Sequence, residues 1–213
     1  GNFGTYNYIT RSTDGATWTD LTNLANAATY EFYGIDYTPF AWIAVGRWGS
    51  PPNKTCIFQS SDAYTWNLRL EGGLSSPILR GAAHHNTLLV VVGDATGSNP
   101  SIFTSTNSTI WTTRTPTIAK SVGLNAVTWA EKISLFIAVG DADGTDGYIL
   151  TSPDGITWTE RANAKNFDLN SVTWSGKQAV AAGAADGTDA YVLTSPDGII
   201  WTERANAKNA ALN

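Results

Sequence analysis

The chain repeats itself, and the repeat constrains its fold more than any other feature. The segment TSPDGITWTERANAKN at residues 151–166 returns as TSPDGIIWTERANAKN at residues 194–209, with fifteen of the sixteen positions identical. A Ser stands six residues before a Trp at five places: Ser12/Trp18, Ser60/Trp66, Ser105/Trp111, Ser152/Trp158 and Ser195/Trp201. Successive Trp residues in this set are 48, 45, 47 and 43 positions apart. A period of this size predicts stacked supersecondary units.

Each unit has the pattern of four β-strands, which we call A to D. In one unit, Leu124–Trp129 is predicted as strand A, and the apolar run Leu135–Gly140 as a strand B that is buried on both faces. Tyr148–Ser152 and Ile156–Arg161 follow as strands C and D, joined by a tight Pro-Asp-Gly turn. An antiparallel unit of this size matches a propeller blade, so we expect an all-β fold, a β-propeller.

The strand count predicts one domain over residues 1–213, with five blades of which one is incomplete. The predicted divisions are a half blade at 1–24, blades at about 30–70, 76–116, 122–162 and 167–206, and the start of a further strand at 210–213. One A–B hairpin is missing from this count. We expect the parent polypeptide to continue beyond Asn213 and supply it; the alternatives are strands from a second molecule or an open ring.

Composition excludes several classes of partner. The net charge of -5 argues against nucleic acid, which requires a basic face that displaces phosphate counterions. No window approaches 18 consecutive apolar residues, so we expect no membrane insertion. The single cysteine, Cys56, takes an apolar position in a predicted strand C and is expected to be buried.

The recurring Ser-x-Asp-Gly-x-Thr-Trp phrase resembles the Asp-box, or BNR-type, repeat of β-propellers such as sialidases, sortilin-like receptors and photosystem assembly factors. It is still more similar to the TSPDGxTWT repeats of many bacterial surface and bacteriophage virion proteins. Two copies depart from the pattern, since Ala63 replaces one Gly and Asn107-Ser108 replaces one Asp-Gly. The resemblance implies an extracellular location, on a virion or cell surface.

The residues of this phrase are predicted to be architectural. The Asp carboxylate is placed to accept backbone N–H groups across the C–D turn, and the Trp to fill the space between adjacent blades. The residues concerned are Asp14, Trp18, Asp62, Trp66, Trp111, Asp154, Trp158, Asp197 and Trp201. In the families that the phrase resembles, it lies on the face opposite the active site.

Enzymatic activity is not expected. A catalytic centre gathers different residues from different blades, whereas a residue repeated in every blade has the same structural task each time. Four of the arginines stand three residues after the motif Trp: Arg69, Arg114, Arg161 and Arg204. His84 and His85 are adjacent on a predicted strand and point to opposite faces, so they do not share a metal. The alternative is a sialidase-like glycoside hydrolase with a degenerate centre.

One loop is a candidate calcium site. Asp141, Asp143 and Asp146 surround a Gly within six residues, and calcium favours oxygen-rich loops of this kind. The alternative is a solvated acidic loop with residues chosen for turn geometry, and we favour this second interpretation. No cofactor is therefore expected.

The topology of a propeller predicts which face binds a ligand. The B–C and D–A connections of a propeller emerge at one end, and here they are rich in Asn, Asp, Gly and Thr. The candidate ligand-binding residues on this face are Arg47, Trp48, Asn99, Asn166, Asp186 and Asp189. Trp48 is placed in a loop, where an indole beside amides and carboxylates suits a sugar ring. The alternative is that Trp48 folds down as a plug for its own loop.

Together these features predict a non-enzymatic β-propeller for recognition or structure on a virion or bacterial surface. The expected partners are a glycan or other surface receptor and neighbouring structural subunits. A purely structural virion or appendage component is the first alternative, and the degenerate hydrolase is the second.

Overall fold

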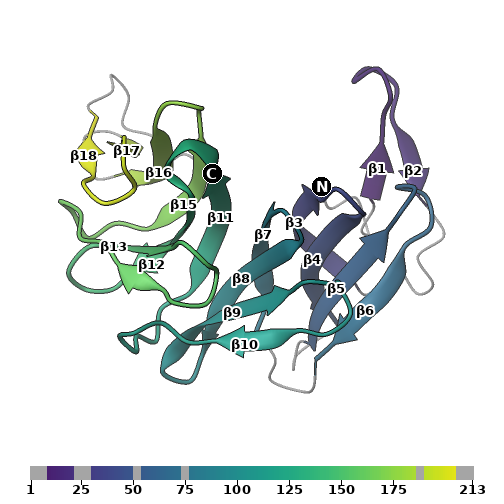
Figure 1. The fold of residues 1–213 in the computed structure, drawn as a ribbon, viewed down its shortest axis with the longest axis horizontal. Helices are drawn as coiled ribbons and strands as arrows, with labels where there is room; N and C mark the ends of the chain where they lie inside the picture. The colour runs from purple at the N-terminus through teal and green to yellow at the C-terminus, as the bar shows by residue number, and fades with distance from the viewer. Residues whose placement is uncertain (1–8, 22–29, 50–53, 73–76, 186–189, 205–213) are drawn as a thin grey trace.

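The computed structural model describes residues 9–21, 30–49, 54–72, 77–185 and 190–204. Within them the chain forms one two-stranded and four four-stranded antiparallel sheets, and Glu131–Ile133 is a single 3-10 turn. The sheets follow one another around an arc from β1 and β2 to β15–β18 (Figure 1). This confirms the predicted all-β propeller of four-stranded blades, with one blade incomplete.

The blades follow the chain in order. Blade 1 holds β1 (Ile9–Arg11) and β2 (Thr19–Leu21). Blade 2 holds β3 (Tyr30–Tyr37), β4 (Trp42–Trp48), β5 (Lys54–Ser60) and β6 (Asn67–Glu71). Blade 3 holds β7 (Leu79–His85), β8 (Leu88–Thr96), β9 (Asn99–Ser105) and β10 (Thr112–Arg114). Blade 4 holds β11 (Leu124–Ala130), β12 (Leu135–Ala142), β13 (Gly147–Ser152) and β14 (Thr159–Glu160). Blade 5 holds β15 (Leu169–Trp174), β16 (Ala179–Ala185), β17 (Ala190–Ser195) and β18 (Thr202–Glu203).

Strand A is the innermost strand of each complete blade. β3 contacts β7, β7 contacts β11, and β11 contacts β15, so these four strands line the inside of the arc. Strands B, C and D then follow outward in sheet order. The predicted further strand at 210–213 lies outside the described residues.

A glycine in strand B fixes the pairing of strands A and B. Each strand A of the complete blades has a register shift near its start, between Leu124 and Ala126 in blade 4. A Cβ on Gly140 would lie 1.9 Å from the carbonyl oxygen of Gly123, so no side chain fits there. The equivalent glycines, with the same close approach, are Gly46, Gly93 and Gly183.

A side-chain carboxylate or amide ties each C–D turn. In blade 4, Oδ1 of Asp154 accepts the backbone N–H groups of Ile156 and Thr157, each at 2.8 Å. The same pair of bonds is made by Asp14, Asp62, Asn107 and Asp197. These bonds correct the predicted strand D at Ile156–Arg161. Ile156 and Thr157 belong to the turn because their N–H groups bind the carboxylate, and β14 begins only at Thr159.

The two altered turns keep the backbone conformation. Ala63 and Ser108 have φ values of 59° and 60°, close to the 69° of Gly155. Nε1 of Trp158 donates to the carbonyl oxygen of Gly155 at 3.0 Å. By contrast, Nε1 of Trp66 and of Trp111 is buried without a hydrogen-bond partner. These copies therefore retain the turn but lose the bond that anchors the indole.

The core lies between blades, and each motif Trp packs toward the blade before its own. Trp158 belongs to the cluster that includes Val90, Val92 and Ile102 of blade 3. Trp66, Trp111 and Trp201 pack in the same way on blades 1, 2 and 4. Trp18 does not fill such a space, contrary to prediction: it is 60% exposed, because no described blade precedes blade 1.

Two further expectations are met. Cys56 is fully buried, and burial raises the pKa of its thiol to about 12. The repeated arginines each bond to strand C, as Nε of Arg161 does to Oγ1 of Thr151 at 2.8 Å. The equivalent bonds are Arg69 to Gln59, Arg114 to Thr104 and Arg204 to Thr194. The arginines thus perform one repeated structural task.

Replacing Gly140 with Ala should destabilise the protein by about 3 kcal/mol or more, since the new Cβ overlaps backbone that cannot move without breaking the sheet. Urea unfolding measures this. The control is Gly15→Ala, where φ is +74° and no atom lies within 4 Å, so only the left-handed conformation costs energy, about 1–2 kcal/mol. Equal effects of the two changes would contradict the role given to Gly140.

Acid should weaken the Asp turns. The N–H groups of Thr65 and Tyr64 and the hydroxyl of Ser60 lower the pKa of Asp62 to about 2 from an ordinary value of 3.8. A lowered folded-state pKa contributes stability above about pH 4, which is lost as the pH falls toward 2. Asp62→Asn should reduce this loss, and Asn107→Asp should add to it. Urea midpoints between pH 2 and 6 measure both, and parallel curves for all three proteins would contradict the prediction.

Candidate functional site

A cavity of about 500 Å³ opens at the end of the propeller that carries the A–B turns. The last residues of three inner strands, β3, β7 and β11, bring their side chains to it from three different blades. The polar and aromatic residues that line it are Asp36, His84, His85, Asn86, Trp129 and Glu131. This volume lies within the usual range for small-molecule sites.

On one side of the cavity, blades 2 and 3 are joined by a carboxylate–imidazole pair. Nδ1 of His84, on β7, lies 2.8 Å from Oδ2 of Asp36, on β3. Both side chains are about one quarter exposed, so the pair faces the cavity while resting on the sheets. No described residue bonds Nε2 of His84, which leaves this atom available to a ligand.

On the other side, blades 3 and 4 meet through stacked rings. The His85 imidazole lies on the Trp129 indole with centroids 3.9 Å apart and planes inclined by 19°. Nε1 of Trp129 donates to Oε2 of Glu131 at 2.7 Å, and Nδ2 of Asn86 lies 2.9 Å from Nε2 of His85. His84 and His85 thus reach opposite neighbours, as their adjacent places on β7 predict.

The cavity therefore combines two carboxylates and two imidazoles with one indole, that of Trp129. Such a set binds hydroxyl or amine donors of a small polar ligand and packs against its carbon atoms. The candidate ligand-binding residues predicted from the sequence lie at the opposite end, and this cavity was not predicted. One signal was present: the equivalent position near the end of strand A is Tyr37, His84 and Trp129 in blades 2, 3 and 4, although Trp174 repeats the Trp in blade 5.

The residues nominated at the other end are engaged within their own blades. Arg47 forms a salt bridge with Glu31 at 2.6 Å. Trp48 was expected in a loop, and this is wrong, since it ends β4 and pairs with Lys54 across to β5. Its ring stacks on Tyr30 at 6.0 Å, and the Lys54 ammonium lies 4.2 Å above it. Trp48 therefore packs against its own blade, whereas the alternative placed it as a plug for its own loop.

The remaining candidates are scattered among blades. Asn99 begins β9, where it pairs with Thr96 in a hairpin. Oδ1 of Asn166 accepts the backbone N–H of Gly144 at 3.0 Å and so braces the acidic loop of blade 4. Asp186 and Asp189 lie outside the described residues.

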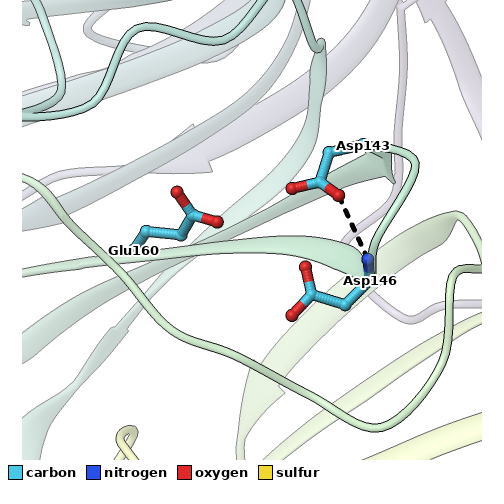
Figure 2. A group of neighbouring side chains, drawn as sticks. All are labelled: Asp143, Asp146 and Glu160. Carbon is cyan, nitrogen blue, oxygen red and sulfur yellow. Dashed lines mark hydrogen bonds between the residues drawn. The ribbon is translucent and has the colours of Figure 1, made fainter.

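The acidic loop forms a cluster, but with a different membership from the predicted one. The carboxylates of Asp143, Asp146 and Glu160 have oxygens within 4.8 Å of one another. Figure 2 shows the three side chains. The backbone N–H of Asp146 donates to Asp143 at 3.1 Å. Asp141 is not part of the group, since it accepts a bond from Asn125 at 2.8 Å.

A lysine supplies the positive charge of this cluster. The ammonium of Lys120 donates to both Asp143 and Glu160. Burial, the largest single effect, opposes ionisation of Asp143. The bonds from Lys120, from the Thr145 hydroxyl and from the backbone N–H groups of Thr145 and Asp146 together outweigh it and lower the pKa of this carboxyl. Burial raises the pKa of Asp146. Lys165 makes the corresponding contact with Glu203 in blade 5, at 2.6 Å, which indicates a repeated structural pairing rather than a calcium site.

Comparisons with known proteins support the fold and do not show a function. No protein-family model matches the chain, and no curated protein matches it. Among solved structures, the chain is similar to YCF48 bound to a D1 peptide, with 15% identity over 89% of this chain and a TM-score of 0.59. A Trypanosoma rangeli sialidase in complex with 2,3-difluorosialic acid matches 92% of this chain, with 14% identity and a TM-score of 0.59. A Niastella koreensis GH74 enzyme matches 94% of this chain, with 18% identity and a TM-score of 0.66.

These similarities show the propeller fold. The chain spans only 57%, 40% and 34% of the length of those three proteins. Within the part of the chain that the structure covers, no helix is long and apolar enough to cross a bilayer.

Replacing Lys120 with Met should destabilise the protein by about 2–3 kcal/mol, because Asp143, whose side chain is 1% exposed, would lose its counter-charge. Thermal and urea unfolding measure this. Lys54→Met is the control: its partner Glu71 is 37% exposed, and the loss should be about 1 kcal/mol. Calcium or a chelator should leave the wild-type melting temperature unchanged, and a calcium-dependent rise of several degrees would contradict our assignment of this cluster.

Proposed function

We propose that the chain is a non-enzymatic recognition propeller whose cavity at the A–B turns binds a small polar ligand, with a glycan as the leading candidate. The observation that carries the proposal is the convergence of Asp36, His84 and Trp129 from three blades on one cavity. Residues repeated for structural reasons are alike in every blade. Asp36, His84 and Trp129 come from three different blades, and each contacts a neighbouring blade as well as lining the cavity.

The chemistry of the cavity suits a sugar better than a purely apolar ligand. Hydroxyl groups bind carboxylates and imidazoles as donors and acceptors, while the carbon face of a sugar ring packs on aromatic walls. The indole of Trp129 contacts the rings of His85 and Phe136, with centroids 3.9 and 4.7 Å away. A wall fixed in this way needs little reordering when a ligand binds.

The carboxylates argue for binding rather than hydrolysis. A glycosidase requires one carboxyl in an apolar setting that keeps it protonated as a general acid. Glu131 has a side chain that is 74% exposed, and Asp36 is paired with His84. Neither has the setting of a general acid, which supports a non-enzymatic role over a degenerate hydrolase.

The Asp-box-like phrase supports a place on a virion or bacterial surface, since repeats of this kind resemble those of surface and virion proteins. The related solved structures contain propellers bound to a D1 peptide and to a sialic acid analogue. Ligand or partner binding is therefore within the range of the fold, and we extend it to this chain as part of the proposal.

A second candidate, a purely structural virion or appendage component, is favoured by one observation. Large apolar side chains are exposed at the same end of the propeller, on A–B and C–D turns. They are Trp18, Tyr37, Phe40, Tyr64, Ile110, Ile156, Ile199 and Ile200. Exposed apolar surface of this kind commonly marks contacts with neighbouring subunits.

A glycan array followed by titration of the hits tests the proposal. Asp36→Asn combined with His84→Gln should weaken binding of the best ligand at least tenfold, because polar contacts of about 1.4 kcal/mol would be lost. The melting temperature should change little. Asn99→Ala at the opposite end is the matched control and should bind as the wild type does.

Two results would count against us. Absence of any glycan binding by the wild type would reject the carbohydrate assignment and favour the structural candidate. Binding that is lost in Asn99→Ala but kept in the double variant would move the site to the other end of the propeller.

A further inference from the structure

Blade 1 has a strand edge that the other blades do not have. In blades 2 to 5, each strand C is paired on both sides, with strand B inside and strand D outside. In blade 1, β1 takes the place of strand C, and among the described residues it pairs only with β2. Among the described residues, the inner edge of β1 has no strand partner, and such an edge is a template for another strand.

The side chains that would lie behind that edge are missing as well. Between blades 3 and 4, the core is filled from blade 3 by Ala83 of strand A, Val90 and Val92 of strand B, and Ile102 of strand C. Between blades 1 and 2, Ile9 is the only described contribution from blade 1, and it corresponds to Ile102. The strand A and strand B positions are empty of described residues.

Two cavities lie along this gap, of about 340 and 250 Å³, and both are lined by Ile9, Thr10 and Ile35. The larger one is walled mainly by apolar groups, including the indoles of Trp18, Trp42 and Trp66. We call the two cavities together, with the free edge of β1, the blade 1 groove.

Ile35 shows that this surface is built to be covered. It is 54% exposed, whereas Val127 and Val172, at the same position in blades 4 and 5, are 8% and 7% exposed. Those valines are covered by the preceding blade. Among the described residues of blade 1, no strand lies over Ile35.

We infer that the blade 1 groove binds an antiparallel β-hairpin whose sequence follows the A–B pattern of this repeat. One strand of the hairpin pairs with the free edge of β1 through main-chain hydrogen bonds. Its alternate apolar side chains then fill the two cavities. The repeat defines the occupant: in the A–B hairpin of blade 4, Ile137 and Val139 correspond to Val90 and Val92, which fill this place between blades 3 and 4.

A synthetic peptide tests this directly. The probe is a fluorescent peptide with the sequence of residues 122–142, added to the full chain. An isolated hairpin is marginally stable in water, so ordering it weakens binding, and we expect a dissociation constant in the micromolar range, on the order of 1–100 μM. The melting temperature should rise on binding, and the amides of β1 should become protected from hydrogen exchange.

Two matched controls locate the contact. A peptide in which Ile137 and Val139 are both replaced by Asp should bind at least tenfold more weakly. Ile35→Glu in the protein should weaken binding of the original peptide to the same degree. Because Ile35 is largely exposed, this variant should melt at the wild-type temperature in the absence of peptide.

Several outcomes would overturn the inference. These are no binding at millimolar peptide, equal binding by the Asp-substituted peptide, or unchanged binding to Ile35→Glu. Sedimentation of the chain alone is the remaining test: a dimer that Ile35→Glu dissociates would show that a second copy covers the groove instead of a hairpin.

Discussion

The packing of each blade against the one before it is the interaction on which the structure depends. Trp158 reaches from the outer part of blade 4 into the core shared with Val90 and Val92 of blade 3, and the same contact recurs at the next interface through Trp201. A single four-stranded blade has two apolar faces and cannot bury either alone, so stability accumulates through neighbouring pairs. In blade 1, no described residue covers Trp18 in this way, and it is 60% exposed.

This packing also creates the candidate site. Because the blades are held face to face, their inner strands end close together, and residues about 45 positions apart in the chain become neighbours. Asp36 meets His84 across one interface, and His85 meets Trp129 across the next. The strand ends are where the repeat is free to vary, since Gly140 and its equivalents constrain the other end of the A–B pairing. The A–B pairing is therefore constrained at one end by Gly140 and its equivalents, while the residues at the other end of strand A can differ between blades.

The acidic cluster shows how a local pattern misleads when its partners are distant. Three aspartates within six residues indicate a calcium loop, and Asp143 and Asp146 do lie together. Glu160 and Lys120 come from separate segments, and the lysine ammonium takes the role that a cation would have. Asp141 turns away to Asn125. The packing of the loops decides which carboxylates contact the Lys120 ammonium, and the spacing of residues in the sequence does not predict it.

The sequence by itself determined the blades. The period, the turn residues and the apolar runs predict four-stranded units, and the regular Ser-to-Trp spacing predicts the ties across each C–D turn, because these features act between residues close in the chain. It overestimated strand D, since the Asp carboxylate competes for amides that a strand would use. Only the tertiary structure decided where the cavity lies, that Trp48 packs on its own blade, and that β1 pairs on one side alone among the described residues. Each of these depends on contacts between blades, whose geometry is set by packing rather than by any one repeat.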